Sequence, residues 1–151
     1  MMSDNPFRVK QIDHVELFVP DQYEAAAWYQ KTFGLEVLPD YEYWAENGPL
    51  MISSDEGNTM LALFKGEPRD CKSRGAFKRV AFRVEGEGFV NFSKRLADYP
   101  VYAPDGRLVH TLEVIDHDLA YSVYFCDPYG NHFEVTTYDI QYVQSRMFNA
   151  D

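Results

Sequence analysis

Glu134 is the residue whose position most clearly requires a positively charged partner. It stands between Phe133 and Val135, in a stretch with the period of a β-strand, so its carboxylate lies on the opposite face from two apolar neighbours. An unpaired charge on the inner face of a sheet is costly. Glu134 therefore needs a cation, which is either a metal ion or the guanidinium of Arg79.

His14 is a candidate metal ligand on another strand. The alternation between Val9 and Val19 places it on one face with Glu16 and Phe18. A neutral imidazole binds divalent metals, but a lone histidine on a strand is more often an ordinary hydrogen-bonded residue. Both interpretations stay open from the residues alone.

Arg79 is unsuited to binding a metal. A guanidinium keeps its proton at any working pH, has no lone pair to offer and repels a metal ion by its charge. It can instead form a salt bridge with Glu134, or bind an anionic ligand such as a carboxylate or phosphonate through two parallel hydrogen bonds. The salt bridge is the structural alternative to the binding role.

Two further histidines and two hydroxyls complete the candidate set. His132 lies two residues before Glu134 on the same face, and His117 lies in an Asp-His-Asp stretch where it is either a proton carrier or a solvated loop residue. Ser122 and Tyr124 alternate with apolar neighbours, so their hydroxyls share one face of the strand, where they can bond within the strand.

An aromatic cluster precedes these residues in the chain. Tyr41, Tyr43 and Trp44 fall on predicted early strands, where they either line a pocket for a flat ligand or serve as strand and dimer-interface residues.

Cys71 and Cys126 have no second pair of cysteines nearby, so they fit neither a disulfide framework nor a zinc site. We read both as free thiols in a reducing compartment, and we propose no cysteine nucleophile.

Length and charge limit the class of protein. With 151 residues and 46% hydrophobic content, the chain can form one domain of ordinary size. A net charge of −10 makes nucleic acids and anionic membranes poor partners. The amino terminus lacks a basic patch followed by an apolar run, and no apolar stretch is long enough to cross a bilayer. We expect a cytoplasmic protein.

The elements that must position these residues form two similar halves, each of order βαβββ. The first half has a strand at Val9–Val19, a helix from Asp21 to Gly34, and strand-like pieces at Leu35–Tyr43, Pro49–Ser53 and Met60–Phe64. The second has a strand at Ala76–Val84, a helix from Gly86 to Pro100, and strands at Leu108–Ile115, Ser122–Cys126 and His132–Thr137.

The two halves align with a change of register. Matching His14 to Arg79 gives an offset of 65, and matching Gly57-Asn58 to Gly130-Asn131 gives 73, so the second half has 73 − 65 = 8 extra residues. We place this insertion in a surface loop around residues 103–106. The predicted modules are residues 9–64 and 76–138 of a single domain, with a linker at 65–75 and a tail or short helix at 139–151.

This order of elements resembles the vicinal oxygen chelate superfamily, which includes glyoxalase I, bleomycin-resistance binding proteins, fosfomycin-modifying enzymes and extradiol dioxygenases. The resemblance covers roughly residues 9–138. Its most specific pieces are Ile12-Asp13-His14-Val15, Trp28-Tyr29 through Phe33-Gly34-Leu35, and Ser122-Val123-Tyr124-Phe125-Cys126-Asp127-Pro128 running into Gly130-Asn131.

The resemblance implies an α+β fold in which two βαβββ modules form a cup-shaped mixed sheet with helices on the convex face. In the enzymes of the family a divalent metal lies in the cup. His14, Arg79 and Glu134 occupy positions that supply His, His and Glu in many relatives, and Leu61 occupies a fourth that is acidic in glyoxalases. Two of these four residues can bind metal here, unless the alignment at Arg79 is displaced.

Two functions follow, and the sequence leaves open whether the chain is an enzyme. We favour a protein with a degenerate metal site that binds a small organic, anionic ligand through Arg79, Ser122, Tyr124 and Trp44. The alternative is a lyase, isomerase or extradiol-type dioxygenase whose single Fe, Mn, Ni or Zn ion is held by His14, Glu134 and a third ligand. There His117 and Tyr124 would be catalytic. The resemblance also implies a homodimer.

Overall fold

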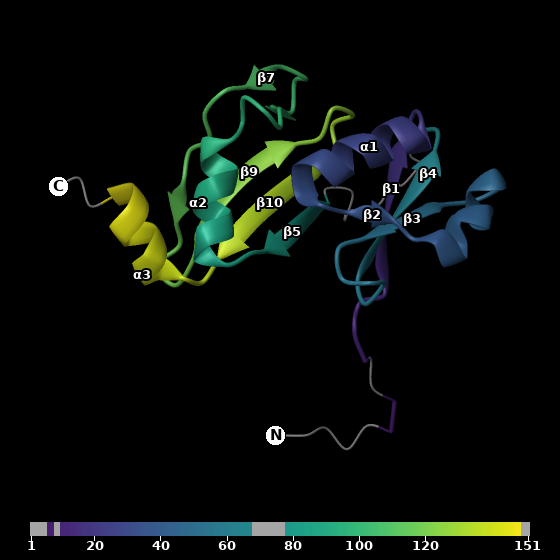
Figure 1. Cartoon of the computed structure of the whole chain (residues 1–151), viewed down its shortest axis with the longest axis horizontal. Helices are drawn as coiled ribbons and strands as arrows, with labels where there is room; N and C mark the ends of the chain where they lie inside the picture. Colours follow the sequence, from purple (N-terminus) through teal and green to yellow (C-terminus); the bar gives the residue numbers. More distant parts are fainter. Residues whose placement is uncertain (1–5, 8–9, 68–77, 149–151) are drawn as a thin grey trace. The chain divides into compact units, whose positions relative to one another are not determined.

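The chain is described by a computed structural model that covers residues 6–7, 10–67 and 78–148 (Figure 1). It divides into two compact units, Met1–Arg69 and Asp70–Asp151, which we call unit 1 and unit 2 and describe separately. The expected linker at 65–75 lies outside the described residues from residue 68 onward, as do Cys71 and the expected starts of both modules. The module boundaries stay a prediction.

Unit 1 has the predicted βαβββ order. Strand β1 pairs in parallel with β4, and β3 and β2 follow in antiparallel, giving the order β1-β4-β3-β2. The elements are β1 (His14–Val19), α1 (Gln22–Phe33), β2 (Glu36–Val37), β3 (Leu50–Ser53) and β4 (Met60–Lys65).

The boundaries of α1 follow from local chemistry. The Asp21 side chain accepts a hydrogen bond from the Glu24 N–H at 2.9 Å and so caps the first turn. Gly34 ends the helix at φ 71°, the left-handed conformation that glycine adopts without a steric penalty. Between them Ala25 and Tyr29 are fully buried. Both predicted helix signals are confirmed.

Unit 2 repeats this topology with additions. Strand β5 pairs in parallel with β10, β9 pairs antiparallel with β10, and the main order is β5-β10-β9-β6-β7, with β8 also on β9. The elements are β5 (Arg79–Arg83), α2 (Gly86–Lys94), β6 (Val101–Tyr102), β7 (Leu108–Val109), β8 (Ile115–Asp116), β9 (Tyr121–Cys126), β10 (His132–Thr137), α3 (Ile140–Val143) and the π-helical turn η2 (Gln144–Phe148).

The matching turns confirm the internal repeat. Gly57 and Gly130, aligned by the sequence, have φ values of 93° and 91° and lie three residues before β4 and two residues before β10. The sheet registers place Met60 beside His14 and His132 beside Arg79, so the offset at the last strand is 132 − 60 = 72 and the second unit has 72 − 65 = 7 extra residues rather than eight. Strands β6 and β7 form a hairpin around an exposed turn in which the Gly106 N–H donates to the Ala103 carbonyl.

The sheet of unit 2 has an apolar face and a polar face. Val123, Phe133 and Val135 are buried on the side that α2 covers, with Phe89 of α2 fully buried too (Figure 1). The alternating residues of β5, β9 and β10 lie on the opposite face. The candidate site residues on β5, β9 and β10 therefore lie on the face of the sheet away from α2, as the period-two pattern of the sequence predicted.

Three predicted elements need correction. The strand Leu35–Tyr43 is wrong beyond Val37, because Pro39 begins a 3₁₀ helix, η1 (Pro39–Glu46), with proline in its first turn. The helix expected to reach Pro100 ends at Lys94. The strand Leu108–Ile115 is two separate two-residue strands, β7 and β8, and the short strand β6 was not predicted.

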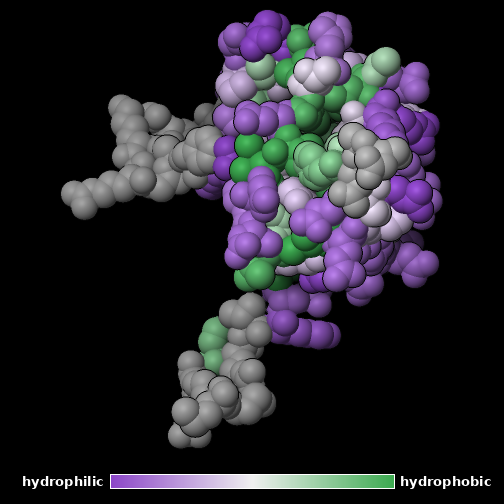
Figure 2. All heavy atoms as spheres, turned by 90° about the vertical axis from the view of Figure 1, so that its left-hand side faces the viewer, coloured by the Kyte–Doolittle hydropathy of each residue, from purple (hydrophilic) through white to green (hydrophobic). Residues whose placement is uncertain are grey.

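Strand β1 begins at His14 rather than earlier among the described residues. The segment after Tyr138, expected as a tail or a short helix, contains α3 and η2 up to Phe148. Figure 2 views the chain from the side of α3, where green hydrophobic side chains show between purple hydrophilic ones. Exposed apolar residues of unit 2 include Leu119 and Phe148. Among the described residues, no helix has the length and apolar character needed to span a membrane.

Candidate functional site

The polar face of unit 2 gathers four of the predicted site residues. In the sheet register Glu134 lies opposite Tyr124 on β9 and Ala81 on β5, while Thr136 lies opposite Ser122 and His132 opposite Arg79. Because side chains alternate along each strand, Arg79, Ser122, Tyr124 and Glu134 share one face. We call this set the unit 2 polar face.

Arg79, Tyr124 and His117 form a continuous chain of contacts. The guanidinium carbon of Arg79 lies 4.6 Å from the centre of the Tyr124 ring, within the range of a cation–π interaction. The Tyr124 hydroxyl lies 2.8 Å from His117 Nε2, a hydrogen-bond distance. The guanidinium of Arg79, the phenol of Tyr124 and the imidazole of His117 thus contact one another in that order.

A tight turn after β8 positions His117. The Asp118 N–H donates to the Asp116 carboxylate at 2.8 Å, and the His117 N–H donates to the Ala120 carbonyl at 2.9 Å. Asp118 has φ 71°, a left-handed conformation that aspartate tolerates better than most residues. The Asp-His-Asp stretch is therefore an ordered turn that directs the imidazole toward Tyr124.

Ser122 is a partner of Glu134. The buried Ser122 hydroxyl donates to Glu134 Oε2 at 2.9 Å and lies 2.9 Å from Thr136 Oγ1. The Thr136 hydroxyl in turn donates to the Tyr121 carbonyl at 3.2 Å. The hydrogen bond from Ser122 fixes the direction in which the Glu134 carboxylate points.

Cys126 and His132 lie at one end of this face. Cys126 Sγ is 3.6 Å from His132 Nδ1, and the thiol is buried. Burial raises the pKa of the Cys126 thiol, the negative charge of Asp127 adds to the rise, and the positive charge of Arg79 opposes it. A raised pKa keeps the sulfur protonated, so Cys126 is not an activated nucleophile.

Unit 1 contains the other two predicted site residues, His14 and Trp44, which line a hollow of about 310 Å³. We call it the unit 1 hollow. Strands β1, β3 and β4 and the helix η1 supply its walls, and its lining residues are Asp13, His14, Glu16, Tyr41, Trp44, Pro49, Met51, Met60 and Phe64.

Two carboxylates hold the His14 ring. Nδ1 lies 2.8 Å from Asp13 Oδ2 and Nε2 lies 3.3 Å from Glu16 Oε2. The hydrogen bond with Asp13 is the largest effect on the pKa of His14 and raises it above the usual 6.5, with Glu16 adding to the rise and burial opposing it. Both ring nitrogens thus face acceptors, which favours the protonated imidazolium.

The residues do not fit the His, His and Glu set that the family implies for a divalent metal. The sequence alignment of the two halves predicts Arg79 at one of the three positions, and its guanidinium has no lone pair to donate. His14 has a carboxylate at each ring nitrogen, and Glu134 accepts a hydrogen bond from Ser122. Within either unit, the described residues contain no group of three or more His, Cys, Asp or Glu side chains arranged to hold a metal ion.

Sequence reasoning found the polar face but missed two sets of contacts. The pairing of His14 with Asp13 and Glu16 was not foreseen, although Glu16 is two residues away on the same strand face. The contact of Arg79 with the Tyr124 ring was also missed. Trp44 lies in η1 rather than on a strand, and Pro39, a residue that favours the first turn of a helix, could have predicted this.

Comparisons with known proteins agree with this architecture. The model of the Glyoxalase/Bleomycin resistance protein/Dioxygenase superfamily matches residues 11–135. The comparison with curated proteins gave no match.

Solved structures share the fold at low sequence identity. A genomically encoded fosfomycin resistance protein, FosX, from Listeria monocytogenes is 15% identical, with a TM-score of 0.63 over 90% of this chain and 99% of that one. A putative glyoxalase family protein from Bacillus anthracis is 24% identical, with a TM-score of 0.61 over 89% and 99%. A glyoxalase/dioxygenase from Nostoc punctiforme is 20% identical, with a TM-score of 0.61 over 91% and 97%.

The family model covers most of the chain, the two units repeat one βαβββ topology, and the solved structures have the same α+β fold. The chain therefore belongs to the Glyoxalase/Bleomycin resistance protein/Dioxygenase superfamily.

Proposed function

We propose that this chain binds a small organic anion on the unit 2 polar face, and that it does so without the three-ligand metal centre of the family's enzymes. The observation that carries the proposal is the position of Arg79, whose guanidinium lies 4.6 Å from the centre of the Tyr124 ring. An arginine at this place supplies positive charge where a histidine would supply a lone pair.

The ring contact also orients the arginine. A guanidinium holds its N–H groups in one plane, which is the geometry that suits two parallel hydrogen bonds to a carboxylate or phosphonate. The contact with the Tyr124 ring reduces the side-chain freedom that binding would otherwise remove. Arg79 is therefore suited to recognising the anionic end of a ligand.

The remaining residues of the face supply polar contacts. Tyr124 offers a phenol bonded to His117, while the buried Ser122 hydroxyl acts through Glu134, whose carboxylate it orients. Such a small number of placed polar groups is typical of ligand sites. If a bound ligand reacts, the 2.8 Å contact between the Tyr124 hydroxyl and His117 Nε2 is a path for one proton.

One solved relative supports the ligand class. A mutant of the Listeria FosX, 16% identical with a TM-score of 0.62, is described as complexed with Mn(II) and a dihydroxypropylphosphonic acid. That protein takes both a metal and a phosphonate. We carry over the anion to this chain, because Arg79 suits it, and do not carry over the metal.

The test is a titration with phenylphosphonate, followed by NMR of the backbone amides, with neutral benzamide as the reference ligand. Arg79→Gln is expected to raise the dissociation constant of phenylphosphonate about tenfold or more, because it removes a charge-assisted pair of hydrogen bonds. The affinity for benzamide is expected to change little.

Arg83 provides the matched control. It lies on the same strand, and its guanidinium carbon is 4.7 Å from the Tyr138 ring, so it repeats the chemistry of Arg79 away from Tyr124. Arg83→Gln is expected to leave phenylphosphonate binding unchanged. Equal losses in both variants, or no loss in Arg79→Gln, would show that the anion does not bind at Arg79.

The homodimer and the cytoplasmic location stay predictions. Light scattering in solution measures the mass of the assembly, and a mass of one chain would contradict the first.

A further inference from the structure

The unit 1 hollow has an aromatic wall built by the geometry of η1. Tyr41 and Trp44 are three residues apart, and a 3₁₀ helix has three residues per turn, so both side chains project from the same side. Their ring centroids are 4.8 Å apart at an interplanar angle of 37°. Both line the hollow, and Trp44 is 40% exposed. The two rings, whose faces carry the negative part of the aromatic quadrupole, thus border an open space.

The charged residues of the hollow are biased toward negative charge. Its lining has two carboxylates, Asp13 and Glu16, and one ionisable base, His14, with no lysine or arginine. The net charge of these lining residues is −1 when His14 is protonated and −2 when His14 is neutral. The hollow therefore attracts cations in either protonation state of His14.

The rest of the wall is apolar and polarisable. Met51, Met60, Pro49 and Phe64 complete the lining. Methionine sulfur and aromatic rings make favourable contacts with flat or methylated groups. The volume of about 310 Å³ falls at the lower end of the range for small-molecule sites.

We propose that the unit 1 hollow binds a small organic cation, of the quaternary or aromatic ammonium class. Trp44 and Tyr41 contact the cation through their ring faces, and Asp13 and Glu16 supply the opposite charge. Weakly hydrated cations with methyl or aromatic substituents suit such a wall better than a bare metal ion or a primary amine, because less hydration is lost on contact with the rings. This proposal does not rest on anion binding by unit 2.

The experiment compares three ligands of one ring each: benzyltrimethylammonium, benzyl alcohol and phenylacetate. Each is titrated into the full chain while the backbone amides of residues 41–46 are followed by NMR. Benzyltrimethylammonium is expected to bind at least about fivefold more tightly than the neutral and anionic ligands, and its affinity is expected to fall with added salt. Binding of phenylacetate as tight as that of the cation would overturn the proposal.

Variants locate the site. Trp44→Leu keeps an apolar side chain but removes the ring face, and is expected to weaken the binding of benzyltrimethylammonium at least about fivefold. Glu16→Gln keeps the size and shape of the side chain, and is expected to weaken the same binding because it removes a negative charge. An unchanged cation affinity in both folded variants would overturn the proposal.

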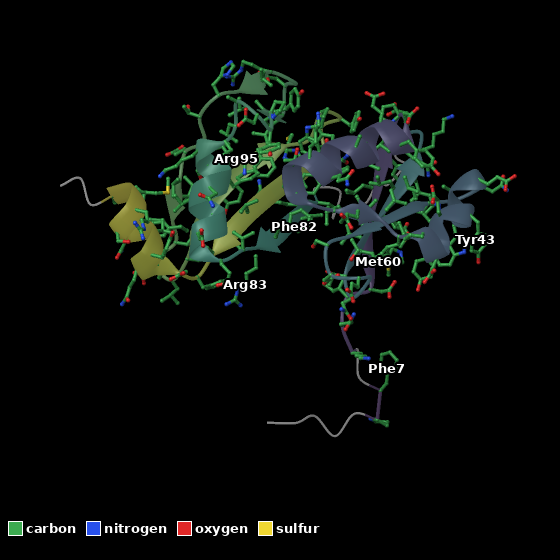
Figure 3. The ribbon with its side chains drawn as sticks, viewed as in Figure 1. Phe7, Tyr43, Met60, Phe82, Arg83 and Arg95 are labelled. Carbon is green, nitrogen blue, oxygen red and sulfur yellow. The ribbon has the colours of Figure 1, made fainter. Side chains whose placement is uncertain are left out.

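Tyr43→Leu is the control, because Tyr43 is 73% exposed on the same helix and does not line the hollow. Tyr43 is well separated from Met60, a residue of the hollow, in the view of Figure 3. The cation affinity of Tyr43→Leu is expected to match that of the unaltered chain. A loss in this variant as large as that in Trp44→Leu would place the cation elsewhere on η1.

Discussion

Arg79 contacts the ring of Tyr124 across an intervening strand, because β10 lies between their strands β5 and β9. The contact therefore passes over the part of β10 that holds Glu134, the register partner of Tyr124. If Arg79 is aligned as the sequence predicts, a cation occupies the polar face of unit 2 where the family's enzymes have a neutral imidazole. The proposed anion binding depends on this relationship.

The Tyr124 ring is predicted to orient Arg79 for binding. Tyr124→Leu removes the ring face and is expected to raise the dissociation constant of phenylphosphonate about fivefold, since the guanidinium loses its stacking partner. Tyr124→Phe keeps the ring, loses only the hydrogen bond to His117 and is expected to stay within about twofold of the unaltered chain. Titration followed by NMR separates the two. Equal losses would assign the effect to the hydroxyl.

Gly86 is predicted to be required for packing between α2 and α3. A Cβ at this position would lie 2.6 Å from Asp139 Oδ2 and 2.9 Å from Tyr142 Cβ, so a neighbouring backbone must move. Gly86→Ala is expected to lower the free energy of unfolding by about 1–3 kcal/mol, measured by urea denaturation.

Gly88→Ala is the matched control in the same helix. The nearest atom to its Cβ would be Val84 Cβ at 3.6 Å, an ordinary contact distance. Alanine is a better helix former than glycine, so this variant is expected to keep or raise stability by up to about 1 kcal/mol. A loss in Gly88→Ala equal to that in Gly86→Ala would contradict the packing explanation.

Asp55 is predicted to make stability depend on pH. Its carboxylate accepts hydrogen bonds from the Thr59 N–H, the Thr59 hydroxyl and the Ser53 hydroxyl, and the bond from the Thr59 backbone contributes most to lowering the pKa of Asp55 below 3.8. A pKa that is lower in the folded state gives stability that is present above the unfolded pKa and is lost as pH falls through the folded value.

Asp55→Asn is therefore expected to melt at a lower temperature than the unaltered chain near neutral pH, with the difference shrinking at strongly acidic pH. Thermal unfolding followed by circular dichroism over a pH series measures this convergence. Glu56→Gln, which removes an exposed carboxylate in the same turn, is the control and is expected to change the pH profile less. A melting difference for Asp55→Asn that is constant with pH would show that its charge is not responsible.

Gln22 is predicted to fix the end of the η1 segment. Its buried side-chain nitrogen donates to the Gly48 carbonyl at 2.8 Å and to the Leu63 carbonyl at 2.7 Å, and so ties the chain after η1 to β4. Gln22→Glu places a carboxylate against two carbonyl oxygens and is expected to cost about 2–3 kcal/mol in urea denaturation. Gln30→Glu on the exposed side of the same helix is the control; a similar loss there would indicate a general charge effect.

The fold was predictable where its signals are local. Asp21 and Gly34 bound α1 through contacts within one turn, and the alternation around His14 and Glu134 identified β1 and β10. The strand predicted at Leu35–Tyr43 was wrong beyond Val37, because Pro39 starts a 3₁₀ helix instead.

For the candidate site, the sequence could predict only which residues share one face of the sheet. A period of two places Arg79, Tyr124 and Glu134 on one side of the sheet, and the structure bears this out. Which of these side chains touch depends on rotamers and on neighbours from other strands, which spacing does not encode. The Arg79–Tyr124 contact is therefore visible only in three dimensions, and the functional roles of these residues stay predictions.

Metal content tests the central claim most directly. Elemental analysis of the unaltered chain, purified without chelator, is expected to find well under one divalent ion per chain, while Arg79→His, which restores a neutral imidazole, is expected to bind more. One tightly held ion per chain in the unaltered protein would contradict the account.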